Sequence, residues 1–266
     1  MIDRCYSPSD LLPLIDWAHF LFAWGFKGAA LSSQKAQDLK EEALKTLTTM
    51  EEQGTHTRAR AIVVDAARED DDLLLYCSDT TLRIPCLRQQ RCDKGSEVCR
   101  CLADYLAPVE KKHPIGNRLG VFATATHAPQ LQTELGAYQK MMLQTLADRL
   151  AEAAAEKLHR EVLCAEWERP MSEPLMGIRP AVGYPSLPDM SINFLLDAIL
   201  HFKDLNITLT ESGMMIPHAA VSGLIFAHPK AVYFNVGPIS EEQFLDYAQR
   251  RNVTAEWLQK FLPYSQ

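Results

Sequence analysis

The sequence lacks both an apolar run long enough to cross a membrane and a block of basic residues. Its longest strongly apolar stretch, residues 17–26, is about half of the roughly 20 residues that a spanning helix needs. The chain carries 27 Lys and Arg against 34 Asp and Glu, for a formal net charge of −7, and its basic residues are interspersed. This charge pattern argues against nucleic acid or a membrane surface as the main partner.

Several motifs of common enzymes are also absent. The 12 glycines include no pair at G-x-G spacing, which argues against a dinucleotide fingerprint and a phosphate-binding loop. The metalloprotease pattern H-E-x-x-H and the hydrolase pattern G-x-S-x-G do not occur either. The pair Cys99-x-Cys101 lacks the spacing of a zinc knuckle, so we expect no metal site and reduced thiols at Cys99 and Cys101.

Length and composition are those of an ordinary globular protein. A chain of 266 residues, 47% of them hydrophobic, can form a large core without disulfides or metals, in one domain or two. The first five residues, Met1-Ile2-Asp3-Arg4-Cys5, do not start a basic segment followed by an apolar one, as a secretory signal would. We therefore predict a cytoplasmic protein.

Hydrophobic periodicity predicts both helices and strands. Apolar residues at three-to-four spacing predict a long helix within 131–167, with others at 11–26, 32–52, 96–106 and 191–202 and two short helices after Ser240. Short β-branched or apolar runs predict strands at 59–65, 73–77, 82–87, 119–124, 207–211, 222–227 and 232–236. The charged stretch 68–72 should be a hairpin tip. Strands in adjacent pairs with short turns imply an antiparallel sheet and an α+β fold.

Residues 177–185, Gly-Ile-Arg-Pro-Ala-Val-Gly-Tyr-Pro, contain the pattern R-x-x-x-G-Y. In this respect they resemble the C-terminal activation module of cobalamin-dependent methionine synthase. Further segments resemble that module in the same order: 15–17 (IDW), 87–90 (LRQQ), 102–108 (LADYLAP), 146–153 (LADRLAEA), 209–212 (LTES), 221–223 (VSG) and 228–229 (HP). The resemblance extends over roughly 11–264, so we expect residues 1–266 to be one domain.

The family implies a single C-shaped α+β domain, with a twisted antiparallel sheet flanked by helices, that binds S-adenosylmethionine. In methionine synthase, one-electron reduction of inactive cob(II)alamin and methyl transfer from S-adenosylmethionine regenerate methylcobalamin. The present sequence has no D-x-H-x-x-G, the corrinoid-carrier signature. The resemblance thus implies a free-standing module whose cobalamin arrives on a partner chain, a methionine synthase or another corrinoid protein, with a flavodoxin- or ferredoxin-type electron donor. We expect no turnover from the chain alone.

A second hypothesis is a non-catalytic module that senses S-adenosylmethionine or docks another corrinoid protein. It is motivated by Met190, since the family has a histidine implicated in cobalamin contact shortly after G-Y-P-x-x-P-D. The family's Trp-Pro-Gly is also replaced, by Ile216-Pro217-His218. We expect His218 to be a surface residue and not a metal ligand.

The Arg motif supplies three candidate ligand contacts. Arginine suits the ligand carboxylate because two parallel charge-assisted N–H bonds fix the carboxylate plane. By match to the family, Arg179 is that residue, and an outward-facing loop arginine is the alternative. Ala181 resembles the position whose main chain contacts adenine. Gly183 is expected to permit a backbone angle or close approach that a Cβ would forbid, unless it is a simple turn glycine.

Two tyrosines and an aspartate extend this set. Tyr184 is predicted to be a core residue, with a place in the ligand wall as the alternative. Tyr233 lies on a predicted strand, where the family has a tyrosine that contacts adenosine; an ordinary strand aromatic is the alternative. Asp16 resembles the carboxylate that binds the ligand's ammonium. An acid inside an aromatic helix is costly unless paired, which favours this role over an exposed helix edge.

Two glutamates complete the candidates. Glu152 shares an i, i+4 stripe with Asp148 and Glu156, and the family places a glutamate near the ligand at the Glu152 position. Glu173 precedes the Arg motif at a matching distance. For both residues the alternative is a solvated acidic surface.

Overall fold

The strand β2 (His56–Glu69) organises the sheet in the computed structural model. Along one edge it pairs with β5 (Arg118–His127), and along the other it pairs first with β1 (Ile2–Tyr6) and then with β3 (Asp72–Tyr76). The strand β4 (Thr81–Pro85) continues from β3, and β8 (Ala220–Ile225) continues from β5. All these pairings are antiparallel, so the order is β4-β3-β2-β5-β8, with β1 beside β2.

The structure describes residues 1–78, 80–92, 95, 97–109, 117–132, 134–171 and 174–262. The α-helices are α1 (Pro8–Leu11), α2 (Trp17–Ala23), α3 (Gln34–Glu52), α4 (Ala137–Trp167), α5 (Ile192–Leu200), α6 (Glu241–Arg250) and α7 (Ala255–Leu258). Short 3-10 turns are η1 (Leu12–Leu14), η2 (Gly28–Ser32), η3 (Leu102–Tyr105), η4 (Pro129–Gln132) and η5 (Phe202–Leu205), and β6 (Thr208–Leu209) pairs with β7 (Met215–Ile216). None of the helices in these ranges is long and apolar enough to cross a membrane.

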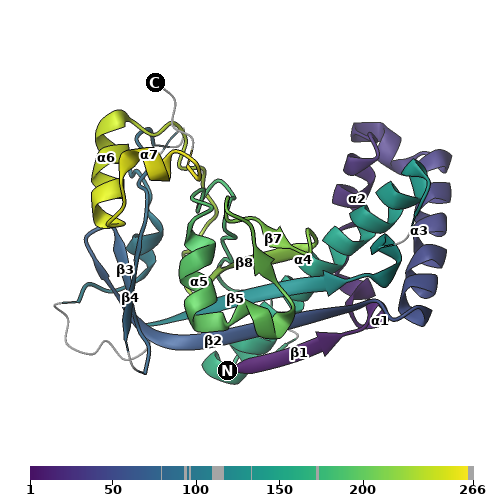
Figure 1. The fold of residues 1–266 in the computed structure, drawn as a ribbon, viewed down its shortest axis with the longest axis horizontal. Coiled ribbons are helices and arrows are strands. Elements are labelled where there is room, and N and C mark those ends of the chain that lie inside the picture. The colour runs from purple at the N-terminus through teal and green to yellow at the C-terminus, as the bar shows by residue number, and fades with distance from the viewer. Residues whose placement is uncertain are drawn as a thin grey trace.

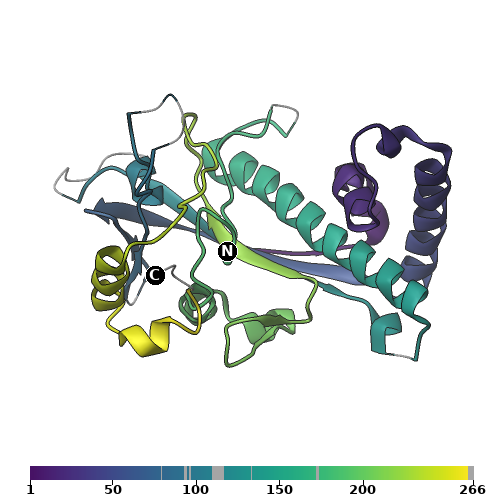
Figure 2. The same cartoon turned by 90° about the horizontal axis from the view of Figure 1, so that it is seen from above.

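Helices cover both faces of the sheet. Figure 2 shows α4 along one face and α5, α6 and α7 on the other. Alternate strand residues point to opposite faces, so Leu224 joins the core under α5 and α6, while Ile225 joins the core under α4. Small residues let α4 approach closely, and the buried Thr124 hydroxyl donates to the Ala151 carbonyl, 3.0 Å away. The long helix is therefore held firmly against the sheet.

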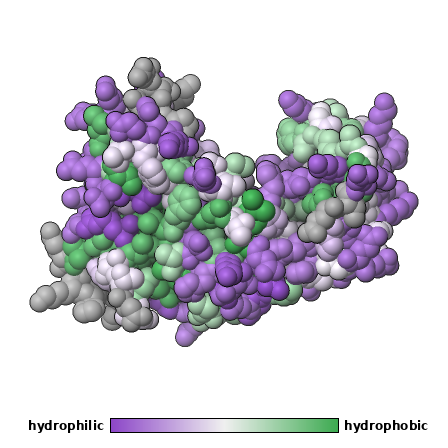
Figure 3. All heavy atoms as spheres, in the orientation of Figure 1, coloured by the Kyte–Doolittle hydropathy of each residue, from purple (hydrophilic) through white to green (hydrophobic). Residues whose placement is uncertain are grey.

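The molecule is C-shaped. In Figure 1, α2, α3 and one end of α4 form one projecting arm, and α6 and α7 form the other. Figure 3 shows the surface hollowed between the two arms. This shape and the antiparallel sheet flanked by helices confirm the predicted α+β fold.

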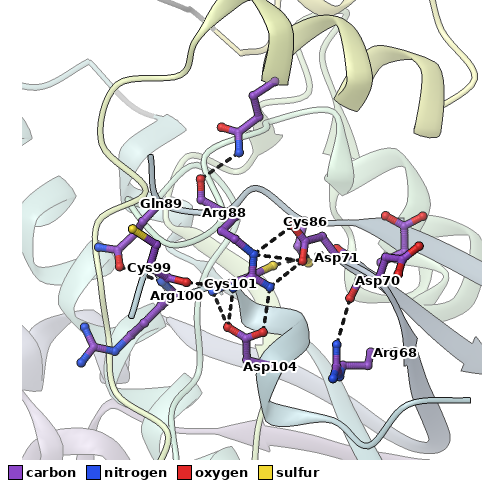
Figure 4. A network of polar contacts seen from close by, with 12 residues as sticks. Arg68, Asp70, Asp71, Cys86, Arg88, Gln89, Cys99, Arg100, Cys101 and Asp104 are labelled. Carbon is purple, nitrogen blue, oxygen red and sulfur yellow. Dashed lines mark hydrogen bonds and ion pairs between the residues drawn. The ribbon is translucent and has the colours of Figure 1, made fainter. Parts of the chain in front are cut away.

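The LRQQ segment joins three distant parts of the chain (Figure 4). The Arg88 guanidinium donates to Asp71 at the β2–β3 turn and to Asp104 in η3. The Gln89 amide donates to the Asn235 carbonyl at 2.9 Å, and Gln243 of α6 donates to the main chain of Arg88 at 2.8 Å. Burial opposes ionisation of Asp104, yet the hydrogen bonds from Arg88 and from the Cys101 N–H, with the positive charge nearby, together outweigh it and lower the pKa of this carboxyl. Arg88 and Gln89 therefore have a structural role, because they connect the β2–β3 turn, η3 and α6.

Most predicted elements are present, including the charged hairpin tip, where Asp70 and Asp71 form the turn. The predicted helix 96–106 was wrong apart from η3. Side chains of Arg88 and Gln89 bind the main chain of Cys99 and Arg100, which keeps this stretch irregular. The predicted strand 232–236 was wrong too.

The expectation of a reduced Cys99 was also wrong. Cys99 is joined to Cys92 by a disulfide, because the chain brings their Cα atoms to within 4.4 Å. Cys101 has a free, buried thiol, as expected.

Candidate functional site

The segment 177–187 is an irregular strap held against β8. Isolated bridges join Ile178 to Phe226 and Ala181 to Gly223. The close approach requires a glycine in β8, since a Cβ on Gly223 would lie 2.2 Å from the Pro180 carbonyl oxygen. Ala181 is buried at this crossing, so its side chain is fixed while its main chain runs along the strap. The strap is therefore a rigid support.

The turn at Gly183 brings Tyr184 to the surface. Gly183 has φ of 84°, and a Cβ there would lie 2.5 Å from the sulfur of Met190, so both backbone angle and space require glycine. Met190 thus packs against the turn. The prediction of a core position for Tyr184 was wrong, because this residue is 52% exposed.

Three carboxylates of α4 face residues from the strap and from the β7–β8 connection. The Tyr184 hydroxyl donates to Glu152 Oε1 at 2.8 Å. One turn away on either side, Asp148 Oδ1 lies 3.6 Å from His218 Nδ1, and Glu156 Oε2 lies 3.5 Å from Arg179 Nη2. The i, i+4 spacing places these acids along about 12 Å of helix. We call the three acids and their partners the polar seam.

Burial keeps two groups in and beside the polar seam uncharged. Burial and the Glu152 carboxylate raise the pKa of Tyr184 to about 12, so the tyrosine keeps its proton at neutral pH. Beneath Arg179, the ring of His159 is fully buried. Burial, with Arg179 and Arg160 nearby, lowers the pKa of His159 to about 3. His159 is therefore neutral and adds no charge beside the guanidiniums.

Arg179 and Tyr233 lie together. The main-chain N–H of Arg179 donates to the Tyr233 hydroxyl at 2.9 Å, and the Arg179 side chain is 18% exposed. This burial contradicts an outward-facing loop arginine. Tyr233 belongs to an irregular segment instead of a strand, since the neighbouring Phe234 and Val236 donate their N–H groups to residues 186 and 185. Its ring is 59% exposed.

The hydrogen bonds of Asp16 are made within its own helix. The predicted helix 11–26 is broken there, because Asp16 is the N-cap of α2 and accepts from the His19 N–H at 2.9 Å. Its side chain is 51% exposed, 2.6 Å from His19 Nδ1. Burial opposes ionisation, yet the hydrogen bonds from His19 outweigh it and lower the pKa of Asp16. Among the described residues, no hydrogen bond or ion pair joins Asp16 to the strap. Glu173 lies outside the described residues.

The chain has similarity to known proteins. The model of the family described as vitamin B12 dependent methionine synthase, activation domain, matches residues 8–252. The chain belongs to this family. It is also similar to a solved structure, the crystal structure of the MetH reactivation domain bound to AdoHcy. The two are 31% identical, with a TM-score of 0.86, and the match covers 99% of this chain and 90% of that one.

In this activation domain, the described candidates fall into two groups. Arg179, Ala181, Gly183 and Tyr184 lie on one strap, with Glu152 and Tyr233 bonded to it. Asp16 begins α2, in the arm that Figure 1 places on the other side of the hollow. Nowhere in the described ranges do three or more His, Cys, Asp or Glu side chains gather as metal ligands would.

The sequence did not reveal the partners of the acidic stripe. The spacing of Asp148, Glu152 and Glu156 is visible in the chain, yet it fits a solvated helix face equally well. The carboxylates of Asp148 and Glu156 are in fact about one-third exposed or less, and they face positively charged or ionisable groups. Among the described residues, Glu156, His159 and Arg160 lie close to Arg179 or to its partner, and the sequence did not indicate them as part of the site.

Proposed function

We propose that this activation domain binds S-adenosylmethionine along the strap. We further propose that it supports the reductive methylation of cob(II)alamin to methylcobalamin on a separately encoded methionine synthase. The observation that carries the proposal is Arg179, a largely buried guanidinium on a rigid strap, in a chain similar to a domain whose structure contains AdoHcy. AdoHcy is the product that remains when S-adenosylmethionine loses its methyl group.

The residues present suit such a ligand. Arg179 offers the planar donor pair that a carboxylate takes. The exposed rings of Tyr184 and Tyr233 provide faces for the sulfonium and the adenosine. Main-chain groups near Ala181 can meet the adenine edge, and the glycine at 183 lets Met190 pack against the turn that carries Tyr184.

Carboxylates are available for the ligand's ammonium. Glu152 lies in the polar seam, and Asp16 lies across the hollow at the start of α2. We propose both as ammonium contacts, and Glu173 by its place before the Arg motif. An ammonium between two such acids would be held by charge-assisted hydrogen bonds.

The reaction needs position more than acid or base chemistry. An external reductant of the flavodoxin or ferredoxin type supplies one electron to the partner's cob(II)alamin. The cobalt electron pair then forms the new bond to the methyl carbon as the carbon–sulfur bond breaks, which leaves AdoHcy. Alignment of the two reactants can lower such a barrier by roughly 7–11 kcal/mol. This is the contribution that we assign to the protein.

A methyl-transfer assay tests the proposal. The chain, a cobalamin-loaded methionine synthase, a reductant and methyl-labelled S-adenosylmethionine should together yield labelled methylcobalamin. The Arg179→Ala variant should yield none above background.

The second candidate function is a sensing or docking module for another corrinoid protein, without turnover. It is favoured by the packing of Met190, whose sulfur lies against the Gly183 turn, at the position where the family has a histidine. Binding of S-adenosylmethionine without labelled methylcobalamin would support this alternative over the first proposal.

A further inference from the structure

Glu156 joins two arginines beside the strap. Its Oε1 accepts from Arg160 Nη2 at 2.9 Å, and its Oε2 lies 3.5 Å from Arg179 Nη2. Arg160 lies one turn further along α4, so both ends of the shorter bond are on one rigid helix. The Glu156 carboxylate is therefore held in place by its own helix and presents its second oxygen to Arg179.

The Arg179 guanidinium has donors to spare. Its ion pair with Glu156 is long, and among the described residues its side chain makes no hydrogen bond. A guanidinium has five N–H donors, so one edge can meet Glu156 while another meets a ligand. The main chain of Arg179 is meanwhile tied to Tyr233. The main chain of Arg179 is thus fixed, whereas its side chain is held only by the ion pair with Glu156 among the described residues.

We propose that Glu156 is a positioning residue, which aims the Arg179 guanidinium at the carboxylate of the bound ligand. The inference rests on the proposed function, because it concerns the same ligand site. Glu156 touches Arg179 and not the ligand. Without the charge of Glu156, Arg179 would lose the ion pair that draws its guanidinium to one side, and each ligand carboxylate would have to order the arginine on binding.

Binding of two ligands distinguishes a loss of Arg179 positioning from a general disturbance of the binding site. AdoHcy carries the amino-acid carboxylate, whereas 5′-methylthioadenosine has the same adenosine and a thioether but no carboxylate. Glu156→Gln keeps the size of the side chain and an acceptor for Arg160. It should weaken AdoHcy binding about tenfold, as expected for one misplaced charge-assisted hydrogen bond, and leave methylthioadenosine binding unchanged.

The matched control is Glu161→Gln. Glu161 lies on the same helix and pairs with Arg4 and Tyr6 instead of the strap, so its loss should leave both affinities unchanged. In an Arg179→Ala background, Glu156→Gln should have no further effect on AdoHcy. This second comparison holds even if the single variant is less stable, since it asks whether the two changes act through one contact.

Each outcome decides the matter. Weaker binding of AdoHcy alone, lost in the Arg179→Ala background, supports the proposal. Equal weakening of both ligands, unchanged affinity or tighter AdoHcy binding overturns it while the proposed function stands. If the wild-type chain binds no AdoHcy at all, the proposed function fails, and this inference fails with it.

Discussion

Replacing the buried His159 by leucine should make the protein less sensitive to acid. The folded state lowers the pKa of this ring to about 3, compared with about 6.5 in an unfolded chain. At a pH between these two pKa values, the ring binds a proton in the unfolded chain and stays neutral in the folded chain. The contribution of His159 to stability is therefore fully present above about pH 6.5 and is lost as the pH falls towards the folded value.

The magnitude follows from the two pKa values. Between about pH 7.5 and about pH 5 the unfolded ring becomes almost fully protonated, while the folded ring stays neutral. The linkage relation gives a loss of about 2 kcal/mol over this interval. Other titrating groups change stability as well, but they do so in wild type and in His159→Leu alike. The difference between the two proteins isolates the histidine.

Urea unfolding at the two pH values measures this difference. The free energy of unfolding of wild type, relative to His159→Leu, should fall by about 2 kcal/mol on acidification. Val162→Ala is the control, because Val162 is buried on the same helix and does not titrate. Its destabilisation should be the same at both pH values. A change below about 0.5 kcal/mol for His159→Leu would refute the argument, since the ring would then not be kept neutral by its surroundings.

Three further predictions concern the fold and the strap. Arg88→Ala should lower the free energy of unfolding by about 2 kcal/mol, because it leaves two carboxylates without their charged donor, and a urea titration with no shift would contradict this. Gly223→Ala should destabilise the fold by about 1–3 kcal/mol and weaken AdoHcy binding, whereas Gly136→Ala, at the N-cap of α4, should leave AdoHcy binding unchanged. Tyr184→Phe should cost about 1 kcal/mol of stability by removing the bond to Glu152, and a double-mutant cycle with Glu152→Gln checks that this bond is the cause.

Local sequence patterns predicted most of the fold because they reflect local forces. The apolar stripe of α4 is continuous, and the hairpin tip contains consecutive acids that solvate well. The pattern within 232–236 alternates as a strand does, yet tertiary hydrogen bonds from Phe234 and Val236 to the strap decide its conformation. A contact of that kind leaves no local periodicity in the sequence.

One error had a signal in the sequence, and another did not. Asp16 directly precedes Trp17, and aspartate is a favoured N-cap, so capping chemistry would have predicted that a helix begins there. The length of β2 was underestimated because its ends are stabilised by different neighbours, β1 on one half and β3 on the other. Pairing of strands far apart in the chain sets those limits.

The motif identified the candidate ligand-binding residues, but it did not predict how they are arranged in space. The strap residues are close in sequence, so the motif names them together. The contacts of α4 with the strap and with His218 join residues 23 to 70 positions apart, and no spacing rule connects them. Only the folded chain shows that each acid of the stripe has its own partner.

The measurement that tests the central claim most directly is the calorimetric titration of AdoHcy into wild type and Arg179→Ala. Saturable binding to wild type and a loss of about 100-fold or more in the variant are expected, because the ligand carboxylate would lose its charged partner in a largely buried site. Arg4→Ala removes an exposed charge away from the strap and should bind as wild type does. Absence of binding to wild type at about millimolar ligand, or equal affinity in Arg179→Ala, would contradict the account.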